Sequence, residues 1–476
     1  MASPIRRIHD TIDFEGMVRA YPAAPEFFES RWIDEPDRLE HLQLERLKEE
    51  LHRAGGISFY RRLWGEAKFE PGQVKTLSDL VLAPPYTVDD IRRSIDLDPP
   101  WGDYQGVGPA DFARQPLRVC FSGGTTGNAR PTLYTLWDRQ VGALLAARAY
   151  YLAGLRPGDV VLNAWAYSTH NGAQNADEAL YQWLGAVPIV TSTGQVTPTI
   201  RQVQLAAEYR AASILTIGDY LLHMADVASS IGLDPKRDFS LRAFPGPAGG
   251  VADKVQEAWG VPSYESYGFH EVSYVAAECP ARGGLHIFED AFIVEIVDVD
   301  TGEPVPEGEL GNIVVTCLYK TGSAQVRYNI QDLSRLYPRS RCECGSWMRK
   351  MDYFRGRSDN MVKLRGTNVW PEAVGQVATQ DERVTSEYFV YADRVGNRDE
   401  MTVQIESAVA ADARQQVASE IGDRLRAQLG VRIGVELVEL GELEGPTERL
   451  TQGKPKRFLD RRHDSRQDPR PDSPEG

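Results

Sequence analysis

Two periodicities of hydrophobic residues alternate through the first half of the chain. Strand-like apolar runs lie at 160–167, 186–190 and 212–217, and helix-like segments lie at 140–153, 174–184 and 198–210. Such alternation predicts parallel strands with helices on the faces of the sheet. Further upstream, leucines spaced between charged residues at 41–53 predict an amphipathic helix, and Thr87 offers an N-cap for a second one. Residues 1–35 lack such a period and are predicted to be irregular.

The pattern changes near Leu285. Apolar runs at 293–300 and 312–319 predict an antiparallel β region, and the chain after Gly356 predicts strands with an amphipathic helix at 411–429. The predicted fold class is therefore α/β. A large N-terminal domain (residues 1–356) carries parallel or mixed sheets flanked by helices, plus a small β region. A small, mobile α+β domain follows at 360–462, and the proline- and charge-rich residues 463–476 are predicted to be disordered.

Composition narrows the range of functions. The 476 residues carry a formal net charge of −15, which argues against nucleic acid as the partner. The sequence has no apolar run near 18 residues and no signal-peptide core at its start, so we expect a cytoplasmic protein without a membrane span. The five cysteines are an odd number, which argues against a disulfide framework.

A glycine-rich loop suggests phosphate binding. The apolar residues Val119, Cys120 and Phe121 indicate the end of a buried strand, and the loop that follows consists of Ser122, Gly123, Gly124, Thr125, Thr126 and Gly127. Glycines let successive backbone amides point into one concavity, and the hydroxyls add further donors. The loop has no lysine and lacks the spacing of a P-loop, so a flexible surface loop is the alternative.

Four metal-ligating side chains form a second candidate site. Cys342 and Cys344 make a C-x-C pair, and His286 follows Cys279 by seven residues. Three thiolates and one imidazole have the composition of a closed, structural zinc site. The alternative is a set of unpaired buried thiols with a core histidine. Cys120 and Cys317 lie inside strand patterns and are predicted to be core residues.

Four further motifs follow the loop in order: Glu265-Ser-Tyr-Gly-Phe-His-Glu271, Arg327-Tyr-Asn-Ile-Gln-Asp332, Gly356-Arg-Ser-Asp-Asn-Met361 and Gly453-Lys-Pro-Lys-Arg457. With the loop, they resemble the adenylate-forming ligases, most closely the phenylacetate–coenzyme A ligases, over roughly residues 40–460. The resemblance implies two half-reactions. A carboxylate first attacks the α-phosphate of ATP to give an acyl-adenylate and pyrophosphate, and a thiol, usually that of coenzyme A, then displaces AMP.

The resemblance also implies roles for individual residues. Residues 122–127 would hold the β and γ phosphates, and Arg130 either adds positive charge there or is a surface arginine. The remaining roles are Tyr267 with Gly268 for adenine, Asp332 for the ribose hydroxyls, Arg357 or Arg327 for ribose or phosphate, Glu271 for Mg²⁺, Lys454 (or its competitor Lys456) for the substrate carboxylate and α-phosphate, and Asp359 for the hinge between domains.

The acid-binding pocket is the least readable part of the sequence. Its candidates, each of which could equally be a packing residue, are Tyr150, Trp165, Tyr167, His170, Asn171, Ala248 and Gly249. An aromatic lining suits a flat aryl acid, and the polar members suit a ring bearing hydroxyl or amino groups.

The sequence thus predicts an aryl-acid ligase that uses ATP, Mg²⁺ and coenzyme A and holds a structural Zn²⁺; a homodimer is left open. One alternative passes the acyl group to a carrier-protein thiol, an amine or a hydroxyl. Another is a non-catalytic AMP-binding protein, which the joint presence of Glu271, Asp332 and Lys454 disfavours. A zinc hydrolase would need an open metal position, and the Cys₃His set is closed.

Overall fold

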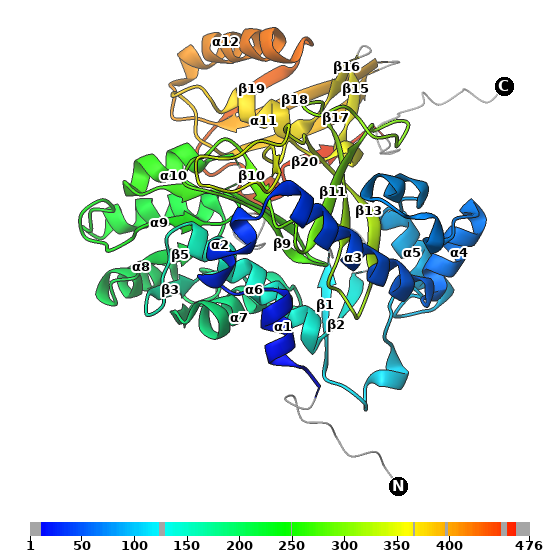
Figure 1. Cartoon of the computed structure of the whole chain (residues 1–476). Coiled ribbons are helices and arrows are strands. Elements are labelled where there is room, and N and C mark those ends of the chain that lie inside the picture. Colours follow the sequence, from blue (N-terminus) through cyan, green and yellow to red (C-terminus); the bar gives the residue numbers. More distant parts are fainter. Residues whose placement is uncertain are drawn as a thin grey trace, which may run out of the picture. The chain divides into compact units, whose positions relative to one another are not determined.

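The computed structural model describes residues 11–122, 129–248, 250–364, 367–395, 398–448 and 455–462. Internal contacts divide the chain into two compact units, Met1–Phe354 and Arg355–Gly476 (Figure 1). The segment 463–476, which the sequence predicts to be disordered, lies outside the described residues.

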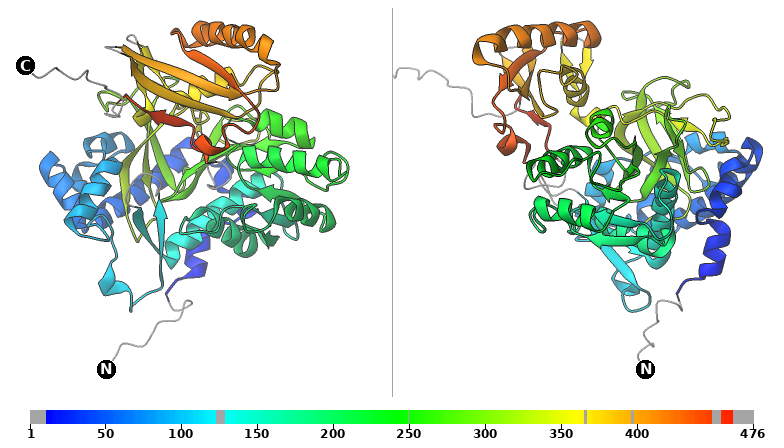
Figure 2. Two further views of the ribbon diagram at one scale, coloured as in Figure 1. Left: turned by 180° about the vertical axis from the view of Figure 1, so that it is seen from behind. Right: turned by 90° about the vertical axis from the view of Figure 1, so that its left-hand side faces the viewer.

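A small parallel sheet with the order β4-β3-β5 occupies one side of the first unit. Its strands are β3 (Val160–Asn163), β4 (Val187–Val190) and β5 (Ser213–Leu215). The helices packed around it are α6 (Leu136–Leu152), α7 (Gly172–Glu178, continued by a π-helical turn at Ala179–Leu184), α8 (Thr199–Glu208), α9 (Gly218–Ser230) and α10 (Ala252–Trp259) (Figures 1 and 2). The predicted alternation and the parallel pairing are confirmed.

The strand β3 is shorter than predicted because a side chain ends it. The Asn163 Oδ1 atom accepts a hydrogen bond from the Trp165 amide (3.3 Å), and its Nδ2 donates to the Ala173 carbonyl (3.1 Å). The chain therefore leaves the sheet at Asn163, and the predicted strand residues 164–167 become a loop at the carboxyl edge.

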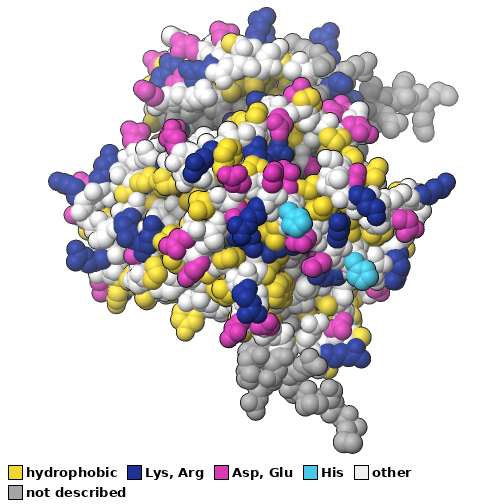
Figure 3. Space-filling view, in the orientation of Figure 1, with side chains coloured by type: hydrophobic (Ala, Val, Ile, Leu, Met, Phe, Trp, Pro, Cys, Tyr) yellow, Lys and Arg dark blue, Asp and Glu magenta, His cyan; other side chains and the backbone are white. Residues whose placement is uncertain are grey.

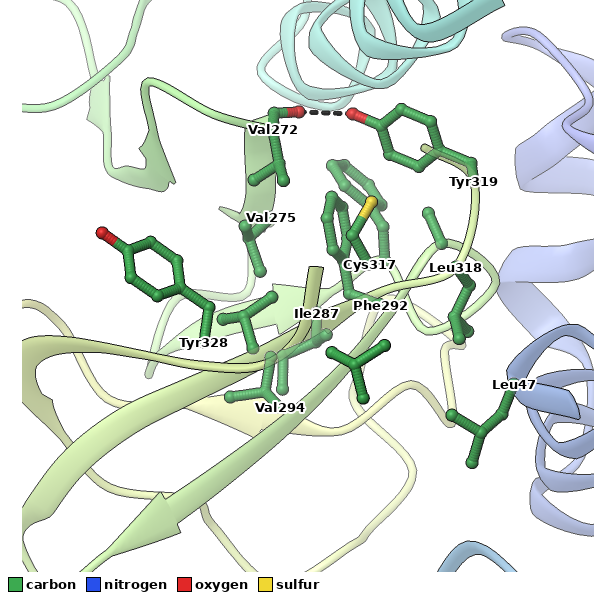
Figure 4. Close-up of a cluster of buried hydrophobic side chains, with 14 of the residues drawn as sticks. Leu47, Val272, Val275, Ile287, Phe292, Val294, Cys317, Leu318, Tyr319 and Tyr328 are labelled. Carbon is green, nitrogen blue, oxygen red and sulfur yellow. Dashed lines mark hydrogen bonds between the residues drawn. The ribbon is translucent and has the colours of Figure 1, made fainter. Parts of the chain in front are cut away.

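Two antiparallel sheets also belong to this unit, and the predicted antiparallel pairing of the runs at 293–300 and 312–319 is confirmed in the first of them. One has the order β11-β12-β13, with β11 at Phe292–Val297, β12 at Gly311–Cys317 and β13 at Gln325–Ser334. The other has the order β14-β10-β9-β8, with β8 at Ser266–Phe269, β9 at Ser273–Glu278, β10 at Leu285–Ile287 and β14 at Lys350–Met351. Their apolar faces share a core with Leu47 of helix α3 (Pro36–Gly55) (Figure 4).

The N-terminal segment is helical, so the prediction of an irregular region was wrong from Phe14 onward. Helix α1 spans Phe14–Ala20 and helix α2 spans Glu26–Glu29. The Asp13 side chain caps α1 by accepting a hydrogen bond from the Gly16 amide at 2.9 Å. Both helices are too short to show a repeat in the sequence, and their buried residues, Met17 and Phe27, belong to the core shared with the antiparallel sheets.

Other elements of this unit agree with prediction or extend it. Helix α5 (Val88–Leu97) begins at Thr87, whose hydroxyl accepts from the Asp89 amide. The remaining elements are α4 (Ser58–Ala67), β1 (Leu117–Ser122), β2 (Arg130–Thr135), β6 (Phe244–Pro245) and β7 (Ser263–Tyr264).

The second unit is a mixed sheet with the order β19-β18-β17-β20, covered by helices. Its elements are β15 (Val362–Leu364), β16 (Thr367–Val369), α11 (Pro371–Ala378), β17 (Tyr388–Val395), β18 (Arg398–Glu406), α12 (Ala411–Leu429), β19 (Gly434–Val438), α13 (Glu444–Thr447) and β20 (Phe458–Asp460). The predicted helix at 411–429 is confirmed, and its residues Ile421 and Leu425 are fully buried in this unit's own core.

None of the helices in the described part of the chain is both long and apolar enough to cross a bilayer. On the face seen in Figure 3, acidic and basic side chains are interspersed among apolar ones.

Candidate active site

The glycine-rich loop connects β1 and β2, which pair in antiparallel register with Ser122 opposite Arg130. Residues 123–128 lie outside the described part of the chain, so Ser122 is the one residue of the predicted phosphate nest that the structure describes. The strand before the loop is confirmed, but it is not buried throughout, because Val119 is 37% exposed while Cys120 is buried. The partner strand β2 is buried from Pro131 to Thr135, so β1 is the more exposed strand of this hairpin.

Tyr267 and Asp332, which are 65 residues apart, meet in the first unit. The Tyr267 hydroxyl donates to Asp332 Oδ2 at 2.9 Å, and both side chains are more than nine-tenths buried. Tyr267 lies on β8 and Asp332 on β13, so this bond links the two antiparallel sheets. Gly268 allows strands β8 and β9 to approach closely, because a Cβ atom at this residue would lie 2.1 Å from the Ser273 carbonyl oxygen.

Glu271 lies in the turn between β8 and β9 and is 5% exposed. Burial raises the pKa of its carboxyl, and the positive charges of Arg130 and Lys320 oppose that rise. Arg130 is the first residue of β2, and its charge acts on Glu271, so the start of β2 lies near this turn. Burial, together with His170, Lys320 and Arg130, lowers the pKa of His270 to about 3, which keeps this imidazole neutral.

Several predicted pocket residues gather against the same turn. Asn171 is buried, donates to the His270 carbonyl at 3.2 Å and accepts from Arg139. The ring of His170 lies edge-on to that of His270, with centroids 5.0 Å apart. The hydroxyl of the fully buried Tyr150 lies 3.4 Å from that of Tyr274 on β9.

The other pocket candidates lie on loops beside the carboxyl edge of the parallel sheet. The Tyr167 amide donates to Ser192 Oγ at 3.2 Å, and its ring is partly exposed. Trp165 is half-buried, two residues beyond the end of β3. Ala248 is buried, and its amide donates to Glu265 Oε2 at 3.1 Å; Gly249 lies outside the described residues.

Arg327 is occupied elsewhere in the first unit. Its guanidinium donates to Glu295 (3.0 Å) and to the carbonyls of Val81 (2.9 Å) and Ala83 (2.6 Å), and the residue is 2% exposed. It fastens the segment before α5 to the antiparallel sheet.

The second unit carries the remaining predicted residues. Arg357 and Asp359 form a two-point ion pair with each other (2.8 and 2.7 Å). Lys454 lies outside the described residues, but the chain on its C-terminal side is anchored: Arg457 donates to Glu387 (2.9 Å) and to the Tyr388 carbonyl (3.0 Å).

The four metal-ligating side chains do converge in the first unit. The ligand atoms of Cys279, His286, Cys342 and Cys344 all lie within 4.8 Å of one another. The sulfurs of Cys279 and Cys342 are 3.7 Å apart, and Cys344 Sγ is 3.4 Å from His286 Nε2. With zinc–sulfur bonds of about 2.3 Å, the edge of a tetrahedron is about 3.8 Å, so the donor set fits a zinc ion.

The histidine of this cluster is held by its other nitrogen. His286 Nδ1 lies 2.9 Å from the Met348 carbonyl, which requires a proton on Nδ1 and leaves Nε2 free to bind a metal. The ring of Trp32 packs edge-on against it at 4.7 Å between centroids. None of the five cysteines forms a disulfide bond in the structure. Cys120 and Cys317 are buried, as expected.

Comparison with known proteins decides the family. The model of the AMP-binding enzyme C-terminal domain matches residues 366–462. The phenylacetate–coenzyme A ligase of Aromatoleum evansii is 31% identical over 90% of this chain and 95% of its own length. The chain belongs to the phenylacetate–coenzyme A ligase family. This membership makes it an enzyme, an AMP-forming acid–thiol ligase. The resemblance to this family that the five motifs showed is confirmed.

Two further relatives support this family assignment. The phenylacetate–coenzyme A ligase of Escherichia coli K12 is 30% identical and covers 90% of this chain and 96% of its own. A crystal structure of a 2-hydroxyisobutyryl-CoA ligase in the postadenylation state, in complex with 2-HIB-AMP, superposes with a TM-score of 0.81. It is 27% identical and covers 91% of each chain. The predicted α/β fold class is thereby confirmed.

Sequence reasoning missed the polar partners that surround the predicted site. Lys320, Arg139 and Tyr134 all contact the turn that carries Glu271 or the side chains around it. Lys320 was detectable as a charge that directly follows an apolar strand, but its partner is 49 residues away in sequence. Nothing in the local pattern identifies that partner.

Proposed function

We propose that this protein activates an aromatic carboxylic acid with ATP, through an acyl-adenylate, and transfers the acyl group to coenzyme A. The observation that carries the proposal is the buried hydrogen bond between Tyr267 and Asp332, together with the buried carboxylate of Glu271, whose charge interacts with that of Asp332. Family membership supports both half-reactions, and the names of the curated relatives supply coenzyme A and an aryl acid as the substrates to test.

Asp332 is the proposed acceptor for the ribose hydroxyls, because a carboxylate can accept from both at once. The Tyr267 hydroxyl holds one of its oxygens, so the other side of the carboxylate is presented in a fixed orientation. The ring of Tyr267, next to the close approach at Gly268, would lie against the adenine.

Glu271 is the proposed carboxylate for a Mg²⁺ ion that accompanies ATP. A hard cation prefers oxygen ligands, and this carboxylate is buried beside the end of the glycine-rich loop. When bound, the ion would neutralise charge on the phosphates. Residues 122–127 would hold the leaving pyrophosphate, and Arg130, at the start of β2, would add positive charge.

Lys454 is the proposed catalytic residue of adenylation, where it would stabilise charge that develops between the substrate carboxylate and the α-phosphate. The bonds of Arg457 to Glu387 and Tyr388 support this role, because they fix the position of the chain shortly after Lys454. Asp359, paired with Arg357, is the proposed hinge about which the second unit turns between the half-reactions.

The aryl acid would bind beside Tyr150, Trp165 and Tyr167; Trp165 and Tyr150 belong to one apolar cluster, and Tyr167 lies on the loop at the carboxyl edge of the parallel sheet. The engaged amide of Asn171 supports a role in shaping this region rather than in direct contact with the acid. A Zn²⁺ ion in the Cys₃His cluster would fasten loops of the β region, since a fully ligated ion has no position for substrate.

The test is a panel of aryl acids with ATP, with and without coenzyme A, in which pyrophosphate release and thioester mass are followed. We expect pyrophosphate with at least one aryl acid and a thioester when coenzyme A is present. Pyrophosphate without thioester would favour a carrier-protein thiol, an amine or a hydroxyl as acceptor. No pyrophosphate with any acid would overturn the proposal in favour of a non-catalytic AMP-binding protein.

The Lys454→Ala variant separates the two half-reactions. We expect it to slow adenylation by orders of magnitude, roughly 100-fold or more, because it removes a charge that acts on the transition state. Thioester formation from pre-made acyl-adenylate should persist. Equal losses in both steps would refute the assignment of Lys454, and the Lys456→Ala variant tests its competitor.

A further inference from the structure

The turn between β8 and β9 is held at three successive carbonyl groups. The His270 carbonyl accepts from the Tyr134 hydroxyl and from Asn171 Nδ2, and the Glu271 carbonyl accepts from Lys320 Nζ at 2.7 Å. The Val272 carbonyl accepts from the Tyr319 hydroxyl, a contact seen in Figure 4. The main chain on both sides of the Glu271 side chain is therefore fixed by donors from other elements.

The donor to Glu271 is the one of these that carries a full charge. Lys320 is fully buried, and its ammonium lies 4.2 Å from the centroid of the Tyr134 ring. A buried ammonium costs free energy unless it is paired and hydrogen-bonded, whereas a neutral hydroxyl donates to a carbonyl at much lower cost. The neighbouring Tyr319 does this at Val272, so fastening the turn does not by itself require a lysine.

The segment that carries Lys320 is itself rigidly placed. The buried carboxylate of Asp138, on α6, accepts from the amides of Thr321 (2.6 Å) and Gly322 (2.9 Å). The Tyr319 carbonyl accepts from the Trp137 indole at 2.9 Å. The ammonium is therefore held at one point, against the Glu271 main chain and the Tyr134 ring of β2, and its charge acts on the Glu271 carboxylate.

We propose that Lys320 is a positioning residue for adenylation: its ammonium holds the main chain of Glu271 and, with its charge, orients that carboxylate for the Mg²⁺ complex of ATP. This inference rests on the proposed role of Glu271. Lys320 does not touch substrate in it, and its effect reaches the reaction through Glu271. Removal of such a supporting partner typically costs 10- to 100-fold in metal affinity or activity.

The test is the Lys320→Met variant of the full chain. Pyrophosphate release is measured against Mg²⁺ concentration at saturating ATP and acid, and thioester formation is measured from pre-made acyl-adenylate and coenzyme A without Mg²⁺. We expect the Mg²⁺ concentration for half-maximal adenylation to rise by about ten-fold or more. The thioester-forming step should stay at the wild-type rate.

A matched control is Lys350→Met, which removes a lysine bond of the same kind, from Nζ to the Arg282 carbonyl at 2.8 Å. It should leave the Mg²⁺ dependence unchanged. An unshifted Mg²⁺ dependence in Lys320→Met, or equal losses in both half-reactions, would overturn the inference and leave Lys320 a packing residue.

A second pair of variants serves if the methionine variant does not fold. Lys320→Gln keeps a donor without the charge, and Lys320→Arg keeps the charge. We expect the glutamine variant to shift the Mg²⁺ dependence and the arginine variant to shift it less; equal behaviour of the two would overturn the inference. If the wild-type enzyme releases no pyrophosphate with any acid, the proposed function fails and this inference fails with it.

Discussion

The hydrogen bond between Tyr267 and Asp332 offers the sharpest test of the nucleotide site. The Tyr267→Phe change removes one oxygen atom and leaves the ring in place. The lost bond is 2.9 Å long, ends on a carboxylate and is shielded from water, since Tyr267 is 5% and Asp332 8% exposed. A bond to a charged group contributes about 1.5–3 kcal/mol, which corresponds to a roughly 10- to 150-fold change in an equilibrium constant.

We expect this loss in kcat/KM for ATP, because the Asp332 carboxylate loses one of the bonds that orient its oxygens toward the ribose. The assay is ATP–pyrophosphate exchange with a fixed aryl acid over a range of ATP concentrations. The KM for the acid should change little, since Tyr267 is assigned to the nucleotide.

The control is Tyr21→Phe, which removes a buried hydroxyl that donates to the neutral Leu318 carbonyl at 3.1 Å. It should lower the free energy of unfolding by about 0.5–1.5 kcal/mol and leave the ATP dependence intact. An unchanged kcat/KM for ATP in Tyr267→Phe would refute the nucleotide assignment, and equal kinetic losses in the two variants would show that the effect is one of stability alone.

Three further predictions concern the metal, the pH dependence and the turn. Purified protein should contain about one zinc ion per chain, and chelation or Cys344→Ser should lower the thermal midpoint; metal-free protein of full stability would contradict this. Burial and Glu278 raise the pKa of Glu265 to about 7. In this range the native state therefore binds more protons than the unfolded state. The free energy of unfolding should fall as the pH rises from about 4.5 to about 7. Glu265→Gln should weaken this dependence of the free energy of unfolding on pH, measured by denaturant titrations at several pH values. The same pH dependence in the variant and in the wild type would refute the assignment. Gly268→Ala should lower the free energy of unfolding, measured by calorimetry, by several kcal/mol, because the added Cβ atom would lie 2.1 Å from the Ser273 carbonyl oxygen.

The sequence predicted what depends on local pattern or on ordered motifs. Alternating periods gave the parallel sheet, and a cysteine pair with a distant cysteine and histidine gave a cluster whose four ligand atoms do meet. The bond between Tyr267 and Asp332 was not predicted, although both residues were assigned to one nucleotide. A local sequence pattern cannot predict which hydroxyl of one sheet lies opposite which carboxylate of another.

The remaining contacts could not be predicted because their partners are remote. Lys320 depends on a carbonyl group 49 residues away, and carbonyls carry no sequence signal. Helices α1 and α2 are held by core residues of the distant β region, so their own residues show no period. Arg357 forms an ion pair with Asp359, which the sequence did not predict, and its contact with the nucleotide stays a prediction.

The burial of the N-terminal segment has a consequence for how the protein is made. The Tyr21 hydroxyl bonds to a carbonyl 297 positions later, and Arg148, stacked on Phe27, pairs with Asp290. At a synthesis rate of about 5–20 residues per second, the ribosome needs roughly 15–60 s to produce that surface. The aromatic residues Phe27, Phe28 and Trp32 therefore emerge long before their packing partners. During translation, this apolar segment therefore stays without the distant part of its packing surface until the β region has been made.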